Sequence, residues 1–280
     1  MSGFGIFLFD ILVITILATI CGADTWTEIN EFGTAKHEWL ETFLELPNGI
    51  PSHDTFSRVF SLIDPQKFEA CFYSWIKSLA IDPHNEIIAI DGKILRGSGN
   101  RRQSQRPLHL VSAWATTQNL LLGQIRTVEK SNEITAIPQL LKMVDLKGNI
   151  VTIDAMDCQS SIAREIKDQG AEYVLNLEEN QPKLYEMMEA IFEMGQSRQY
   201  KKMLHRRKVE KVHDHRRIET RCYTLISARD PAVFQLRWPA LKGLGLLEVT
   251  RTTNNQVEYS KRYFLNSLAY ENIDVIQTTL

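Results

Sequence analysis

The sequence predicts an α/β protein with a mixed sheet, preceded by a helical domain and followed by a β-rich insertion. Two apolar runs, EIIAID and NIVTID, are typical of buried strands, and each ends in an acid, Asp91 or Asp154. Before residue 82 apolar residues recur at helical spacing, and after it strand and helix patterns alternate. We therefore expect an N-terminal helical domain, residues 1–82, and a second domain, residues 83–280.

The composition is that of an ordinary globular protein, with 44% hydrophobic and 24% charged residues, so a disordered chain is not expected. The formal net charge of -2 argues against a wholly basic nucleic-acid coat. Basic residues gather locally, however: residues 198–221 hold ten Lys or Arg against three acids, and residues 92–106 hold five against none. Such patches favour a DNA-binding face on a near-neutral protein.

The four cysteines show no zinc-ligand spacing, so we expect free thiols in a reducing cytoplasm. The apolar run near the N-terminus is interrupted by Asp10, and residues 11–21 are shorter than the roughly 20 residues that a spanning helix needs. We expect a buried helix here and no membrane association. A membrane-anchored helical protein is a competing hypothesis that fractionation would eliminate.

The first domain is predicted to be all helical. Ile11, Ile14 and Leu17 fall at helical spacing, and Gly22 is suited to end that helix. Further helices are expected to start at Asp24 or Thr25, at Ser52 or Asp54, and at Asp64. The domain is interpreted either as a DNA-contacting module or as a helical cap on the next domain.

The second domain begins with three strands, 86–91, 108–115 and 120–128, the last two joined by a hairpin turn at Thr117 to Asn119. A helix at 134–144 with Pro138 in its first turn, a strand at 149–154, a helix ending at Gly170 and a strand at 172–177 follow. This β-β-β-α-β-α-β order is that of the ribonuclease-H-like fold. Its first and fourth strands are neighbours, which places Asp91 and Asp154 within reach of one metal pair.

After residue 181 the pattern changes. A helix at 182–194 and the basic segment 198–217 precede strand-like pieces at 218–227, 245–252 and 259–268, and a further helix starts near the end. We interpret these strands as a β-rich insertion after the fifth strand.

Phosphodiester chemistry needs an activated nucleophile and charge neutralisation, which two magnesium ions held by carboxylates supply. Asp91 and Asp154 are the predicted catalytic and metal-binding pair; the alternative is that each only caps a helix or turn. A complete site in this fold needs a third carboxylate from a later helix. Glu219, in RRIETR, is the conspicuous candidate within the chain, although a salt-bridged acid among arginines explains it as well, and Asp157 is interpreted as a helix cap.

Basic residues near the acids are candidates for DNA phosphate contacts, which would be salt-dependent and carry little sequence information. His213 and His215 share a strand face, but without a neighbouring cysteine or histidine a metal site is not favoured. For these basic residues and histidines, the alternative to DNA contact is a solvated loop. The residues predicted to bind DNA are Lys93, Arg96, Arg101, Arg102, His215 and Arg217, with Arg106 in the same loop as the first four.

Ordered motifs over nearly the whole chain resemble the H-repeat-associated transposases linked to Rhs elements, a branch of the insertion-sequence DDE transposases. The segments that carry the resemblance are CGADTW, LPNGIPSHDTFSRVF, AIDGKILRG, HLVSAWA, EKSNEITAIP, VTIDAMDCQ, YVLNLEENQP and RRIETR. The resemblance implies a ribonuclease-H-like catalytic domain, DNA cleavage and strand transfer at element ends, and Mg²⁺ or Mn²⁺ as cofactor. It also implies double-stranded DNA of element ends and target as partner, and a homo-oligomer when active. Asp91 and Asp154 match the first two acids of the family.

The chain departs from the family pattern at Ile94, Asp157, Glu178, Glu179 and Arg216. The family's third acid belongs to a W-x-I-E-N helix followed by an HW pair, and no such motif occurs before Leu280. We therefore expect a truncated copy. Two hypotheses follow: a DDE transposase whose activity depends on a third carboxylate, and a non-catalytic DNA-binding remnant.

Overall fold

The computed structural model of the chain forms two compact units, residues 1–74 and residues 75–280. The structure describes residues 7–79, 85–95, 107–127, 133–154, 158–178, 181–214, 217–230, 238–253 and 256–280.

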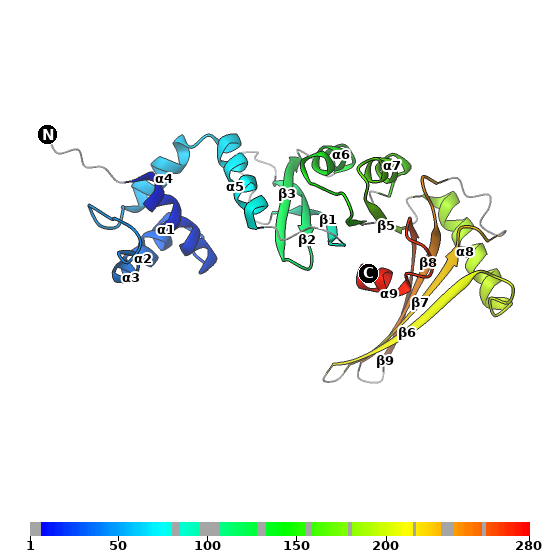
Figure 1. Cartoon of the computed structure of the whole chain (residues 1–280). Coiled ribbons are helices and arrows are strands. Elements are labelled where there is room, and N and C mark those ends of the chain that lie inside the picture. The colour runs from blue at the N-terminus through cyan, green and yellow to red at the C-terminus, as the bar shows by residue number, and fades with distance from the viewer. Residues whose placement is uncertain are drawn as a thin grey trace. The chain divides into compact units, whose positions relative to one another are not determined.

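The first unit is helical, as predicted. Its core contains Ile14, Leu40 and Phe56, all fully buried. Thr25 caps the second helix through a capping box with Glu28, which satisfies backbone N–H groups at the helix start. The helices are α1 (Leu8–Ile20), α2 (Trp26–Ala35), α3 (His37–Leu40), α4 (His53–Leu62) and α5 (Pro65–Leu79), the last of which crosses the boundary between the units (Figure 1).

Asp10, which interrupts the apolar run of the first helix, is a buried residue of that helix. Its side chain is 3% exposed, and its Oδ2 accepts a hydrogen bond of 3.3 Å from the backbone N–H of Leu46. The bond compensates part of the cost of burying a carboxylate. Among the described residues, none of the helices combines the length and the apolar character that spanning a bilayer requires.

The second unit is built on one nine-stranded mixed sheet with the strand order β3-β2-β1-β4-β5-β9-β8-β7-β6. The pairs β1·β4 and β4·β5 are parallel, and the remaining pairs are antiparallel. The first and fourth strands are neighbours, as the element order predicted. The strands are β1 (Ile87–Ile94), β2 (His109–Ala115), β3 (Leu120–Thr127), β4 (Ile150–Ile153), β5 (Glu172–Leu177), β6 (His205–Asp214), β7 (Arg217–Ser227), β8 (Gly243–Thr253) and β9 (Gln256–Asn266).

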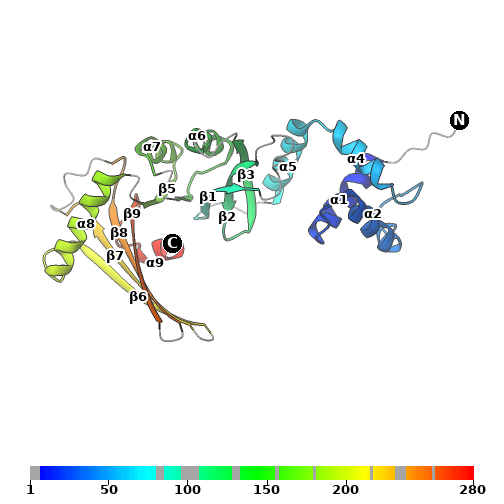
Figure 2. The same cartoon turned by 180° about the vertical axis from the view of Figure 1, so that it is seen from behind.

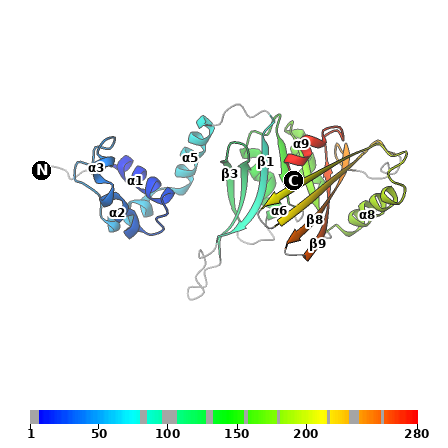
Figure 3. The same ribbon diagram turned by 90° about the horizontal axis from the view of Figure 1, so that it is seen from below.

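Helices cover the two faces of the sheet unequally. α6 (Glu133–Met143), α7 (Ser160–Asp168) and α8 (Pro182–Ser197) pack on one face and form the larger core with β1 and β4. α9 (Ile273–Thr278) packs on the opposite face, over β4, β5 and the long strands. Figures 1 and 2 show α6 and α7 on one side of the strands and α9 on the other, and Figure 3 views the sheet from the side of α9. We call these the α6 face and the α9 face.

The amino-terminal ends of β1 and β4 are tied together by buried polar groups. The side-chain oxygen of Asn149 accepts a hydrogen bond of 3.1 Å from the backbone N–H of Glu86. The Glu86 carboxylate in turn accepts a bond of 2.7 Å from the backbone N–H of Thr117, in the predicted hairpin turn. These bonds fix the register in which the two strands run toward their carboxyl ends.

Two details differ from the sequence-based prediction. The segment 205–214, expected to be part of a basic connection, is the edge strand β6. Its charged residues conceal the strand pattern, yet charges are usual on edge strands because they discourage pairing with other chains. Pro138 lies inside α6 rather than in its first turn, so one backbone hydrogen bond of that helix is missing.

Gly245 on β8 provides a test of the packing on the α9 face. It pairs with Phe264 on β9, whose ring is fully buried, and a Cβ at position 245 would overlap that ring. We predict that Gly245→Ala lowers the free energy of unfolding by about 1–3 kcal/mol, the usual cost of overpacking. Chemical denaturation measures the change; Ser260→Ala, at an exposed position of β9, is the control. Equal stability of the two variants would contradict the packing.

Candidate active site

The strand register places Asp91 and Asp154 side by side. Ile90 of β1 pairs with Ile153 of β4, so the next residue on each parallel strand is an aspartate. Asp91 lies on β1, which continues past it, and Asp154 follows β4 directly. The structure thus brings together the two acids that the sequence singled out.

Both aspartates lie on the α9 face. Ile90 and Ile153 are buried in the core under α6 and α7, and successive residues of a strand point to opposite faces. The side chain of Asp91 is 54% exposed, and Asp154 is also exposed. Both carboxylates are therefore accessible from the side of the sheet that α6 and α7 leave uncovered.

Lys93 lies beside Asp91 on the same face. Its Nζ is 3.4 Å from Asp91 Oδ2, and its side chain is 77% exposed. An ion pair this exposed contributes little to stability, so the ammonium group can exchange its partner for a phosphate at small cost.

A cavity of about 280 Å³ lies next to Asp154, at the carboxyl ends of β4 and β5 and beside Arg262 of β9. Ile153 of β4 pairs with Leu175 of β5. The residues that follow this pair, Asp154 and Asn176, therefore lie at the same level on the α9 face. The Oδ1 atom of Asn176 is buried, and no described residue is a hydrogen-bond partner for it. The residues that line the cavity are Asp154, Asn176, Leu177, Glu178 and Arg262.

The aspartates fit a hard divalent cation. Carboxylate oxygens are the ligands that Mg²⁺ prefers, and one or two protein carboxylates with several waters are its usual set. Within the described part of the chain, no group of three His, Cys, Asp or Glu side chains comes together to hold a metal ion.

Several predicted residues lie outside the described residues. These residues are Arg96, Arg101, Arg102, Arg106, Asp157 and His215.

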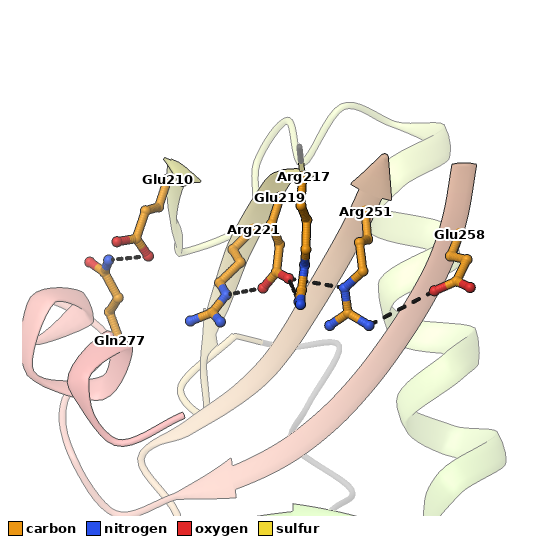
Figure 4. Close-up of polar contacts among 7 residues, drawn as sticks. All are labelled: Glu210, Arg217, Glu219, Arg221, Arg251, Glu258 and Gln277. Atoms are coloured by element: carbon orange, nitrogen blue, oxygen red, sulfur yellow. Dashed lines mark hydrogen bonds and ion pairs between the residues drawn. The ribbon is translucent and has the colours of Figure 1, made fainter. Parts of the chain in front are cut away.

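Glu219 lies on β7 at the centre of an arginine cluster (Figure 4). Its carboxylate, 6% exposed, accepts hydrogen bonds from Arg217, from Arg221 Nε at 2.7 Å and from Arg251 Nε at 3.1 Å. Figure 4 shows Arg221 and Arg251 on opposite sides of the carboxylate. The bonds from Arg217 and then Arg221 lower the pKa of Glu219 to about 2.

The structure does not bring Glu219 to the aspartates. Strands β5, β9 and β8 separate β7 from β4 in the sheet. Neighbouring strands lie about 4.8 Å apart, so the two carboxylates are separated by roughly 19 Å across the sheet. Glu219 and Asp154 therefore do not share one cation.

Sequence reasoning missed Asn176 and Arg262. The pairing of β5 with β9 joins segments about ninety residues apart, and no local sequence pattern predicts which strands pair. The alternation of Arg262 with the buried Tyr263 and Phe264 shows only that Arg262 shares a face with Phe264.

The Glu219 cluster predicts a pH-dependent stability. Because the pKa of Glu219 is lowered from 4.5 to about 2, its stabilisation is complete above 4.5 and is lost as the pH falls through about 2. We expect Glu219→Gln to be less stable than wild type by roughly 1–3 kcal/mol at neutral pH, and the difference to shrink in acid. Unfolding curves over a pH series measure it. Glu258→Gln is the control, since that carboxylate is 75% exposed and pairs only at 3.8 Å; a pH-independent difference for Glu219→Gln would refute the assignment.

Comparison with known proteins identifies the family. Residues 82–268 match the family described as "Transposase DDE domain", and residues 7–76 match the one described as "DDE_Tnp_1-associated". The "Uncharacterized protein in dhlA 3'region" of Xanthobacter autotrophicus is 43% identical over 261 residues, 93% of this chain and 87% of that protein. The "H repeat-associated putative transposase YhhI" of Escherichia coli (strain K12) is 37% identical over 265 residues, 93% of this chain and 69% of that protein.

Among solved structures, the piggyBac transposase synaptic complex with hairpin DNA aligns with a TM-score of 0.43 and 12% identity, over 96% of this chain and 54% of that one. This likeness is too weak to support an inference. The matches in sequence are sufficient by themselves: the chain belongs to the DDE transposase family, with relatives named as H repeat-associated transposases.

Proposed function

We propose that the chain is a DDE-type transposase that carries out metal-dependent DNA cleavage and strand transfer for an insertion-sequence-like element. The observation that carries the proposal is the pairing of Ile90 with Ile153, which sets Asp91 and Asp154 next to each other on one open face. Because the chain belongs to the DDE transposase family, a role in metal-dependent DNA cleavage is proposed for these two acids.

The proposed fold of the catalytic domain is ribonuclease-H-like. In its support, the segment β3-β2-β1-β4-β5 consists of three antiparallel strands followed by two parallel ones that are reached through α6 and α7. The strands β6 to β9 would then be the β-rich insertion, placed after the fifth strand and α8.

Asp91 and Asp154 would hold Mg²⁺ or Mn²⁺ through their carboxylate oxygens. When bound, such ions neutralise phosphate charge and activate the attacking oxygen. The protein's own groups hold the cation against the sheet and orient the DNA strand. Lys93 is placed to contact a phosphate beside Asp91.

We propose a structural role for Glu219 rather than a catalytic one. This carboxylate accepts bonds from three guanidinium groups, whose positive charges repel a metal cation. Its function is to hold Arg217, Arg221 and Arg251 in fixed positions. Their side chains are about two-fifths exposed, and the cluster keeps a positive charge of 3 − 1 = +2, or +1 when Glu258 is included.

The proposed partner is double-stranded DNA, bound by Lys93 and Arg217 among the described residues. Arg96, Arg101, Arg102 and His215 remain predictions for the same role. Guanidinium groups suit phosphates because they donate two parallel N–H bonds. Binding would weaken with salt as counterions are released. A homo-oligomer when active and a location in the cytoplasm complete the proposal.

A second candidate function is DNA binding without catalysis. One observation favours it: the described residues contain no group of three potential metal ligands. It predicts salt-sensitive DNA binding and no metal-dependent strand nicking.

Asp91→Asn and Asp154→Asn test the catalytic assignment. We expect each to reduce nicking of a supercoiled plasmid that carries the DNA flanking the coding sequence by about 100-fold or more, a common loss when charge stabilisation is removed. Gel electrophoresis of the plasmid forms with Mg²⁺ or Mn²⁺ measures it, and EDTA should abolish nicking. Asp168→Asn, at an exposed position of α7, is the matched control. Unchanged nicking in both active-site variants would reject the proposal, and no nicking in wild type would favour the second candidate.

Glu219→Gln tests the third acid. Because this side chain is distant from the aspartates across the sheet, we expect the folded variant to nick the plasmid within about 3-fold of wild type, with the fold confirmed by circular dichroism at neutral pH. A loss as large as that of Asp91→Asn would instead make Glu219 part of the catalytic machinery.

A further inference from the structure

Arg262 is a cation on the α9 face that lines the same cavity as Asp154. It lies on β9, two residues before the buried Phe264, and both residues belong to the α9 face. Leu177, the last residue of β5, pairs with Tyr263, so Arg262 lies level with Glu178, just past the end of β5. Arg262 lines the cavity beside Asp154 and is exposed.

Three other arginines of the insertion on the same face are already paired with a carboxylate. Arg217, Arg221 and Arg251 all bond to Glu219, as Figure 4 shows. The partner of Arg262 on β8 is the apolar Leu247. In the described part of the chain, no carboxylate lies within ion-pair distance of the Arg262 guanidinium. Its charge is therefore available to a ligand.

The cavity beside Arg262 has room for a ligand. A volume of about 280 Å³ accommodates a phosphate group with several waters, each of which takes about 30 Å³. Asp154 and Arg262 both line this space.

The two aspartates repel a DNA phosphate, so a cation at the same end of the sheet must help to hold it. Arginine is suited to this because its planar guanidinium donates two parallel bonds to phosphate oxygens. We infer that Arg262 binds a DNA backbone phosphate next to Asp154 and positions the strand that is cleaved. This inference rests on the proposed transposase function and names a positioning residue for it.

The first experiment measures the salt dependence of DNA binding. A fluorescent duplex of the element-flanking DNA is titrated with protein in Ca²⁺, over a series of potassium chloride concentrations. We expect Arg262→Gln to reduce the slope of log affinity against log salt by about 0.9, the value for one lost phosphate contact on duplex DNA. Arg262→Lys should restore the slope. Arg164→Gln, at an exposed position of α7 on the α6 face, is the matched control and should keep the wild-type slope.

The second experiment locates the contact. One phosphate at the mapped nicking position is replaced by a neutral methylphosphonate. Wild type should lose affinity for this duplex, whereas Arg262→Gln should bind both duplexes equally, because its contact is already absent.

The outcomes separate the two proposals. If Asp91→Asn and Asp154→Asn lose nicking but Arg262→Gln keeps the wild-type salt slope, the role of Arg262 is refuted and the proposed function stands. A lower melting temperature for Arg262→Gln without a change in slope refutes it as well, since Arg262 would then only stabilise the fold. Normal nicking by both aspartate variants overturns the proposed function itself.

Discussion

The parallel pairing of β1 with β4 is the constraint on which the site depends. Four residue pairs, from Ile87 with Ile150 to Ile90 with Ile153, set the register. A shift of one residue would turn the apolar side chains of one strand to the wrong face, so burial under α6 and α7 enforces the register. The same alternation turns the next residue of each strand outward. The core therefore positions Asp91 and Asp154 from the opposite face of the sheet.

The amino-terminal ends of these strands strengthen that constraint. Asn149 receives the backbone N–H of Glu86, and the Glu86 carboxylate secures the β2–β3 turn through Thr117. Buried hydrogen bonds to polar groups are specific in geometry, because a displaced partner would be left unsatisfied. The hydrogen bonds at the amino-terminal ends and the apolar packing in the middle of the strands thus favour the same register. The carboxyl ends of the strands are not needed to fix it.

The insertion uses charge differently from the aspartate end. On β7 and β8 a single buried carboxylate pairs with three arginines and holds them together as a positive surface. Water has little access to the carboxylate at the centre of this cluster. Beside Asp154, Arg262 faces apolar Leu247 and an open cavity instead. The two arrangements suit different tasks: the first stabilises long, partly exposed strands, and the second leaves a cation available at the acids.

The sequence by itself determined the mixed α/β class, the order of most elements and the position of an acid at the end of each of two neighbouring strands. It did so because apolar β-branched runs, helix caps and turn residues act locally, and because an acid at the end of each buried strand is visible in the chain. It missed β6, whose charged edge position hides the strand pattern. The pairing of β5 with β9, and with it the approach of Asn176 and Arg262 to Asp154, was decided only by the tertiary structure. Pairing between distant strands depends on the packing of the whole sheet, as does the separation of Glu219 from the aspartates, and neither leaves a local signal in the sequence.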